Sequence, residues 1–270
     1  YTPTHTLSLH DALPIWATQS TRQPGSSFKP LIYQSAIDFG YSPATTLHDV
    51  ARTYEYEKKD LEKMAKNQDP KLWQPQNYEE DFVGLITMED ALVHSRNLAT
   101  INLVQNAGFN NIYQKVKKLD INVPKNLSLA LGNVGASPME MAKFYSMFLS
   151  GGMMLEPVLI ERVLDRRGNT VEQNSAKATY FTSKQQSFLV VDMLREVVRR
   201  GTGRRVQVDG IELGGKTGTT NDMKDNWAVG WTPKALVLSW VGNNDNTSMK
   251  SVASGISGAT PIWREIMIEA

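Results

Sequence analysis

Hydrophobic residues recur every three or four positions through most of the first 200 residues, which is the spacing of the buried face of a helix. Glycine, proline and capping residues interrupt these periodic stretches and mark helix ends. In one strongly amphipathic stretch, Phe188, Val191, Leu194 and Val198 form the predicted buried face. We predict helices over residues 25–39, 87–94, 98–107, 111–119, 137–148 and 183–200, with a further periodic stretch at 261–270.

The polar segment 41–82 interrupts this pattern, and its charged run at 55–60 favours a surface excursion with one short helix. After residue 210 the hydrophobic period changes to two, which indicates strands. Three consecutive strands are predicted at 211–220, 226–231 and 235–242, and a separate strand at 158–163 precedes a turn at 166–169. Helices first and an antiparallel meander last predict an α+β layer fold.

The composition is that of a soluble globular protein: of 270 residues, 41% are hydrophobic and 21% are charged. A net charge of +1 gives no indication of a nucleic-acid partner. The chain has no cysteine, which excludes a thiol nucleophile, disulfides and thiolate metal sites. Its four histidines show no metal-ligand spacing, and no apolar run reaches the roughly 18–20 residues of a membrane span.

The first residues differ in character from the rest. Residues 6–15 resemble the in-frame translation of a DNA-sequencing adapter. We therefore predict that 1–15 is a non-native leader, with a natural leader of low complexity as the alternative. Residues 16–270 would then form one domain truncated at both ends, because the C-terminal helical stretch also stops without a capping residue.

Three short motifs stand out because of their order along the chain. Each occurs by chance in many proteins. In this order they form the Ser-x-x-Lys, Ser-x-Asn and Lys-Thr-Gly set of the penicillin-recognising serine acyltransferases. The set predicts a nucleophile, a base, a proton relay and a group that binds a carboxylate. The motifs are Ser26-Ser27-Phe28-Lys29, Ser95-Arg96-Asn97 and Lys216-Thr217-Gly218-Thr219.

Ser26 is the predicted nucleophile and Lys29 its base. Pro30 lacks an amide hydrogen and must lie in the first helical turn, which puts Ser26 at a helix N-terminus and Lys29 on the same face. A lysine can take the serine proton only if it is partly neutral. Burial and the ammonium of Lys216 would lower its pKa in that way. The alternative is a helix-capping serine beside a solvated lysine.

The other two motifs predict substrate contacts. Ser95 can relay a proton from Lys29 to a leaving amine, and Asn97 offers an amide to a peptide-like substrate, although both residue types also cap helices. Lys216, Thr217 and Thr219 suit a terminal carboxylate, and Gly218 allows a ligand close to the strand. The backbone N–H groups of Ser26 and Thr219 are the predicted oxyanion hole. A phosphate loop is excluded because strands, and not a helix, follow.

Residues 17–270 resemble the transpeptidase domain of class A penicillin-binding proteins, the bifunctional peptidoglycan synthases. The segments that carry the resemblance are 22–30, 128–132, 137–142, 215–222, 240–242 and 258–263. The resemblance implies the fold shared with serine β-lactamases, in which helices flank an antiparallel sheet beside an all-helical lobe. It also implies D-Ala-D-Ala stem peptides as substrates, an acyl-enzyme on Ser26, inhibition by β-lactams, and no cofactor.

The same resemblance implies a parent protein that acts at the periplasmic, extracytoplasmic face of the bacterial cytoplasmic membrane. A glycosyltransferase domain and a membrane anchor would precede this chain. The family places strands before its Ser-x-x-Lys helix, where this chain has its adapter-like residues. We therefore expect residues 1–15 to lie outside the core and the sheet to keep an unpaired edge, at a cost in stability.

Two other functions remain open. A serine β-lactamase shares the three motifs, but a class A enzyme also needs a glutamate that activates the deacylating water. No Glu-x-x-Leu-Asn segment occurs between Asn97 and Lys216. A non-catalytic β-lactam-sensing module would be acylated and remain so. Release of D-Ala from a stem-peptide mimic separates that module from a transpeptidase.

Overall fold

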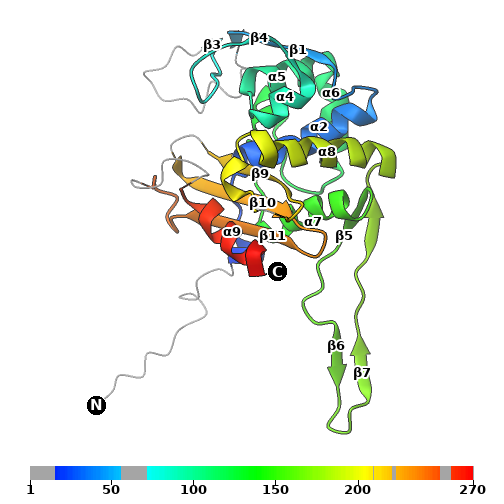
Figure 1. Cartoon of the computed structure of the whole chain (residues 1–270). Coiled ribbons are helices and arrows are strands. Elements are labelled where there is room, and N and C mark those ends of the chain that lie inside the picture. Colours follow the sequence, from blue (N-terminus) through cyan, green and yellow to red (C-terminus); the bar gives the residue numbers. More distant parts are fainter. Residues whose placement is uncertain (1–15, 56–71, 209, 221–222, 250–256, 270) are drawn as a thin grey trace, which may run out of the picture.

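The computed structural model describes residues 16–55, 72–208, 210–220, 223–249 and 257–269. The predicted leader 1–15 lies outside these residues and stays a prediction. Helices and a three-stranded antiparallel sheet pack against each other, with most helices on one side of the sheet (Figure 1). The predicted α+β class is therefore confirmed. Within the described ranges, no helix is long and apolar enough to cross a membrane.

The long helices follow the predicted pattern closely. Ser137 and Glu140 form a capping box at the start of α7, and Thr87 and Ser183 cap α4 and α8. The α-helices are α1 (Trp16–Gln19), α2 (Lys29–Asp38), α4 (Met88–Val93), α5 (Asn97–Asn106), α6 (Phe109–Lys117), α7 (Pro138–Leu149), α8 (Lys184–Arg200) and α9 (Ala259–Glu269). Short 3₁₀ turns are η1 (Gly25–Phe28), η2 (Leu127–Leu131) and η3 (Arg204–Val206).

Helix α2 lies at the centre of the helical part. Nine consecutive residues, from Lys29 to Ile37, are buried, and the helix packs against α4, α5, α6 and α8. The turn η1 leads into it, so the helix predicted from residue 25 begins with 3₁₀ geometry. Gly25 starts that turn with φ +52°, and Pro30 lies in the first turn of α2, where its missing N–H leaves no helical acceptor unsatisfied.

The sheet contains β9 (Gly214–Thr219), β10 (Asp225–Trp231) and β11 (Leu236–Gly242) in the order β11-β10-β9. The predicted meander is confirmed, although its first strand starts at Gly214 instead of residue 211. Gly214 pairs with Trp231, the last residue of β10, so residues 211–213 have no partner strand. On one face Trp227, Val229 and Trp231 join the main core; on the other, Ala228 packs with α9.

Three local predictions differ from the structure. The strand predicted at 158–163 overlaps only the start of β6, because residues 158–161 form no strand ladder, although Ile160 and Glu161 accept hydrogen bonds from Asn174. Segment 41–82 contains strands that the polar composition concealed, and its predicted short helix stays a prediction, because residues 56–71 lie outside the described ones. The short strands are β1 (Thr46–Asp49), β2 (Tyr54–Glu55), β3 (Leu72–Trp73), β4 (Gly84–Thr87), β5 (Met153–Leu155), β6 (Arg162–Leu164), β7 (Thr170–Gln173) and β8 (Ala178–Tyr180).

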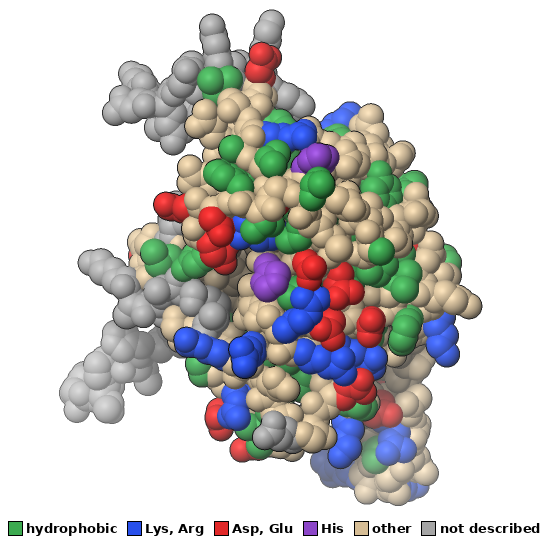
Figure 2. All heavy atoms as spheres, turned by 45° about the horizontal axis from the view of Figure 1, so that its top comes forward, with side chains coloured by type: hydrophobic (Ala, Val, Ile, Leu, Met, Phe, Trp, Pro, Cys, Tyr) green, Lys and Arg blue, Asp and Glu red, His purple; other side chains and the backbone are tan. Residues whose placement is uncertain are grey.

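The third correction concerns α8. Phe188 is 56% exposed, whereas Val191, Leu194 and Val198 are buried as predicted. The buried stripe is centred about one position away from the predicted one, since small Ser187 faces inward and donates to the Met147 carbonyl. On the face shown in Figure 2, basic and acidic side chains are interspersed, and that face carries no large surface of one sign.

Candidate active site

The turn η1 presents two neighbouring serines differently. Ser27 is buried, its hydroxyl donates to the Pro24 carbonyl (2.7 Å), and its own carbonyl accepts from the Tyr145 hydroxyl (2.5 Å). Ser26 is half-buried, and its hydroxyl makes no hydrogen bond to any described residue. Of the two hydroxyls, only that of Ser26 is free to react.

Lys29 is fully buried at the start of α2. Its Nζ donates to the Ser95 carbonyl (2.5 Å) and to Asn97 Oδ1 (2.8 Å), and it lies 3.3 Å from Ser95 Oγ. Burial, and secondly the nearby charge of Lys216, holds the pKa of Lys29 well below its ordinary value of 10.5. A neutral amine keeps two N–H donors for the two close acceptors. Its lone pair remains available for a proton.

Lys216 on β9 completes a chain of contacts between two lysines. Its Nζ donates to Ser95 Oγ (2.9 Å) and to the Thr217 carbonyl (3.0 Å), so the Ser95 hydroxyl lies between both amines. Burial lowers the pKa of Lys216 to about 7. The structure thus brings together four of the predicted residues, Lys29, Ser95, Asn97 and Lys216, from α2, the α4–α5 turn, α5 and β9.

Tight backbone packing sets η1 against β9. A Cβ on Gly25 would lie 2.7 Å from the Thr219 carbonyl oxygen, and one on Gly218 would lie 2.3 Å from the Pro24 carbonyl oxygen. Both positions therefore require glycine. Thr217 and Thr219 are half-buried along β9, one of the two edge strands of the sheet among the described residues. The predicted oxyanion hole, formed by the N–H groups of Ser26 and Thr219, stays a prediction.

Asn97 has a partner at each end of its amide. Besides Lys29 at its oxygen, its Nδ2 donates to the Gln76 carbonyl (2.8 Å). Its predicted contact with substrate is untested, and its visible contacts orient Lys29. A cleft of about 930 Å³ is lined by Gln23 and Thr220, which are near the motifs in sequence, but by none of Ser26, Lys29, Ser95, Asn97 and Lys216.

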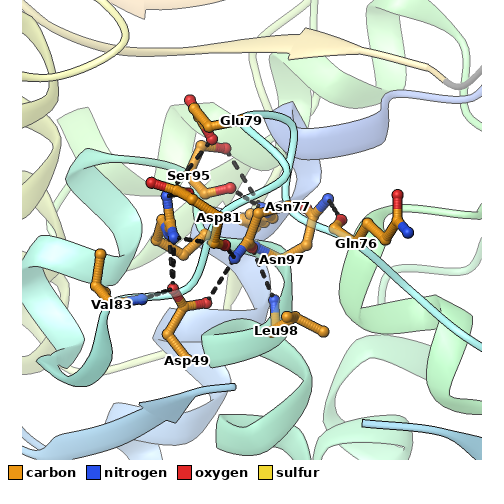
Figure 3. A network of polar contacts seen from close by, with 11 residues as sticks. Asp49, Gln76, Asn77, Glu79, Asp81, Val83, Ser95, Asn97 and Leu98 are labelled. Atoms are coloured by element: carbon orange, nitrogen blue, oxygen red, sulfur yellow. Dashed lines mark hydrogen bonds and ion pairs between the residues drawn. The ribbon is translucent and has the colours of Figure 1, made fainter. Parts of the chain in front are cut away.

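A buried polar network beneath the Ser-x-Asn motif was missed by sequence analysis. Figure 3 shows Asp49, Asn77 and Asp81 converging under Ser95 and Asn97, and Arg96 joins the two aspartates by ion pairs. Arg96 stood inside a recognised motif, but an arginine alone does not reveal whether it is buried. Asp49 and Asn77 carried no local signal, since their contacts with the motif lie 47 and 20 residues away along the chain.

A serine stands at the start of a central buried helix, and a lysine lies on an edge strand beyond a turn that carries a second serine. This arrangement defines the class of penicillin-recognising serine acyltransferases. The family model for the transpeptidase domain of penicillin-binding proteins matches residues 1–268. The chain belongs to this family, as its resemblance implied.

Penicillin-binding protein 1A of Aquifex aeolicus is 36% identical over 252 residues, which cover 93% of this chain and 33% of the relative. Penicillin-binding protein 1A of Pseudomonas aeruginosa is 30% identical over an aligned length of 305 positions, which covers 93% of this chain and 36% of the relative. The chain therefore spans about a third of the length of these curated relatives.

Solved structures show the same fold. The crystal structure of penicillin-binding protein 1A from Haemophilus influenzae has a TM-score of 0.82 at 25% identity, over 93% of this chain and 42% of that one. Penicillin-binding protein A from M. tuberculosis, in an imipenem acyl-enzyme complex, has a TM-score of 0.77 at 18% identity, over 97% of this chain and 63% of that one. The second likeness is one of fold alone.

Proposed function

We propose that the chain is a serine D,D-transpeptidase domain that cross-links peptidoglycan stem peptides through an acyl-enzyme on Ser26. One observation carries the proposal: the buried Lys29 amine, three residues from the free hydroxyl of Ser26, contacts a Ser95 hydroxyl that also binds Lys216. Such a chain of groups can move a proton from a nucleophile to a leaving amine.

In the acylation step, Ser26 Oγ attacks the carbonyl carbon of the penultimate D-Ala and its proton passes to Lys29 Nζ. The N–H groups of Ser26 and Thr219 would stabilise the oxyanion that forms. As the C–N bond breaks, Ser95 passes its hydroxyl proton to the departing D-Ala nitrogen and takes in its place the proton that Lys29 received, which leaves Lys29 neutral for the second step. Lys216 holds the terminal carboxylate by a charge-assisted hydrogen bond, with Thr217 and Thr219 beside it.

In the second step, an amine of another stem peptide, or water, attacks the Ser26 ester. Lys29 takes a proton from that amine, and Ser26 Oγ regains a proton as the ester bond breaks. A β-lactam would acylate Ser26 by opening its ring. No cofactor takes part in this scheme.

The relatives are called penicillin-binding proteins 1A and are about three times as long as this chain. We extend the proposal to the whole protein: a peptidoglycan synthase with a glycosyltransferase domain and a membrane anchor, active at the extracytoplasmic, periplasmic face of the bacterial cytoplasmic membrane. Its partners would be stem peptides and β-lactams, and no nucleic acid.

The test is to incubate the chain with a fluorescent penicillin and to map the labelled peptide. We expect the label on Ser26 and none on a Ser26→Ala variant, while Ser27→Ala, which loses only the internal hydrogen bond to Pro24, keeps it. A label on Ser27, or one that survives Ser26→Ala, would refute the assignment. Release of D-Ala from a stem-peptide mimic then separates a transpeptidase from a module that stays acylated.

A further inference from the structure

The buried network under the Ser-x-Asn motif, which we name the Arg96 clamp, consists of Asp49, Asn77, Asp81 and Arg96. Arg96 Nε and Nη2 lie 2.8 and 2.7 Å from one oxygen of Asp49, and Nη1 lies 2.7 Å from Asp81 Oδ1. Asn77 Nδ2 donates to the other oxygen of Asp49 (2.9 Å). Asp49 is 0%, Asn77 3% and Arg96 5% exposed, so the Asp49–Arg96 pair is compensated away from water, whereas the Asp81 side chain is 58% exposed and pairs with Arg96 at the surface.

The clamp joins three segments that are distant in sequence. Asp49 ends β1, Asn77 belongs to the loop before β4, and Arg96 lies between α4 and α5. Asn77 Oδ1 accepts the N–H groups of Asn97 (2.8 Å) and Leu98 (3.3 Å), and it thereby caps the first turn of α5. These contacts fix the Arg96 side chain and the backbone that follows it, and Ser95 directly precedes Arg96 in the chain.

The residue before Arg96 has a strained backbone. Ser95 has φ +56°, a left-handed conformation that a non-glycine residue keeps only where its surroundings impose it. Its carbonyl and Asn97 Oδ1 are the two close acceptors of Lys29. Each residue that holds Lys29 is therefore a chain neighbour of Arg96.

We propose that Asp49, Arg96 and Asn77 are positioning residues that hold Ser95 and Asn97 against Lys29 and so keep its amine aimed at the reacting proton. The inference rests on the proposed function, since it assigns these residues to the base of that reaction. They touch no substrate and act only through the turn. A buried ion pair contributes little to stability compared with apolar packing, so we expect its main effect on the geometry of the turn.

The charges near Lys29 affect its pKa, and the pH dependence of acylation therefore gives a measurement that a purely structural role would not change. Burial lowers the pKa of Lys29 most, Lys216 and Arg96 lower it further, and Glu79 and Asp49 raise it. Acylation needs the neutral amine, so its rate falls on the acid side of that pKa. Asp49→Asn should move this acid limb to lower pH, whereas Arg96→Met should move it to higher pH.

The experiment measures the acylation rate of the full chain by fluorescent penicillin across pH, together with the thermal midpoint. The variants are Asp49→Asn, Arg96→Met and Arg96→Lys. Arg200→Met is the matched control, since Arg200 likewise pairs with two acids on α4 but on the surface, at 2.6 Å from both. We expect Asp49→Asn and Arg96→Met to lower the plateau rate about ten- to a hundred-fold, the cost of misplacing a reacting group by up to about 1 Å.

Arg96→Lys keeps the charge but not the two-pronged contact, so we expect a rate between those of the wild type and Arg96→Met. Arg200→Met should stay within about twofold of the wild type, because exposed pairs contribute little. Folded clamp variants with the wild-type rate, or a control that slows equally, would overturn the inference. If Arg96→Met does not fold, the acylation rates of Asp49→Asn and Arg96→Lys test the inference. If none of the three folds, the network is structural and the inference fails.

Failure of the proposed function would show itself separately, as a wild-type chain that takes up no penicillin. The clamp is then judged by NMR titration of lysine ¹³Cε signals, with Lys29→Arg to assign the signal. Opposite shifts in the pKa of Lys29 for Asp49→Asn and Arg96→Met support the clamp. An unchanged pKa in both variants contradicts it.

Discussion

Replacing Lys216 by methionine removes a buried charge and keeps an unbranched side chain of similar length. The wild-type ammonium is 3% exposed and contacts Ser95 Oγ at 2.9 Å, so methionine loses this hydrogen bond and the proposed contact with the substrate carboxylate. A charge-assisted hydrogen bond contributes roughly 1.5–3 kcal/mol. At about 1.4 kcal/mol per decade, acylation should slow by about one to two decades.

Stability should change in the opposite direction. Burial lowers the pKa of Lys216 from 10.5 in the unfolded chain to about 7, so the unfolded state binds more protons between these values. The wild type therefore gains stability as pH rises from about 7 to 10.5, and below about 7 it carries the full cost of a buried charge. Each pKa unit corresponds to about 1.4 kcal/mol. At pH 7, Lys216→Met should unfold at a higher temperature than the wild type.

The assay combines stopped-flow acylation by a fluorescent penicillin at subsaturating concentration with thermal unfolding, both from pH 6 to 10. In the wild type, acylation should weaken as pH rises through about 7, because Lys216 loses its charge. That alkaline limb should be missing in Lys216→Met. A variant that is less stable than the wild type at pH 7, or that acylates at the wild-type rate, would refute the reasoning.

Three further predictions concern packing. Gly25→Ala should slow acylation and lower the thermal midpoint, because its Cβ would meet the Thr219 carbonyl. Gly168→Ala is the control: Gly168 has φ +85° and a Cβ there would have nothing within 4 Å, so this variant should show only the backbone cost of about 1–2 kcal/mol. Tyr145→Phe should cost about 0.5–1.5 kcal/mol in urea unfolding, since its hydroxyl donates to a carbonyl of η1. Replacing residues 1–15 by the genomic upstream strands should raise the midpoint, because β11 has no outer partner among the described residues; equal midpoints would mean that the edge needs no strand.

Much of the fold followed from local patterns in the sequence. Hydrophobic period and capping residues located the long helices, and the change of period located the meander, because these signals depend on neighbours within a few residues. Pro30 placed Ser26 at a helix N-terminus without any tertiary information. The order of three motifs was enough to indicate the family that the matching model then showed.

Tertiary structure alone decided which of those residues touch and which are buried. The strand predicted at 158–163 was displaced because a strand requires a partner, and β7, across a short turn, pairs only with residues 162–164. The low pKa values of Lys29 and Lys216 arise from burial that no local pattern reports. Asp49 and Arg96 are 47 residues apart, and only the packing of β1 against the α4–α5 turn turns two ordinary charges into one buried pair. Desolvation and long-range contact are properties of the folded chain, so the sequence named the reacting groups while the fold set their environment.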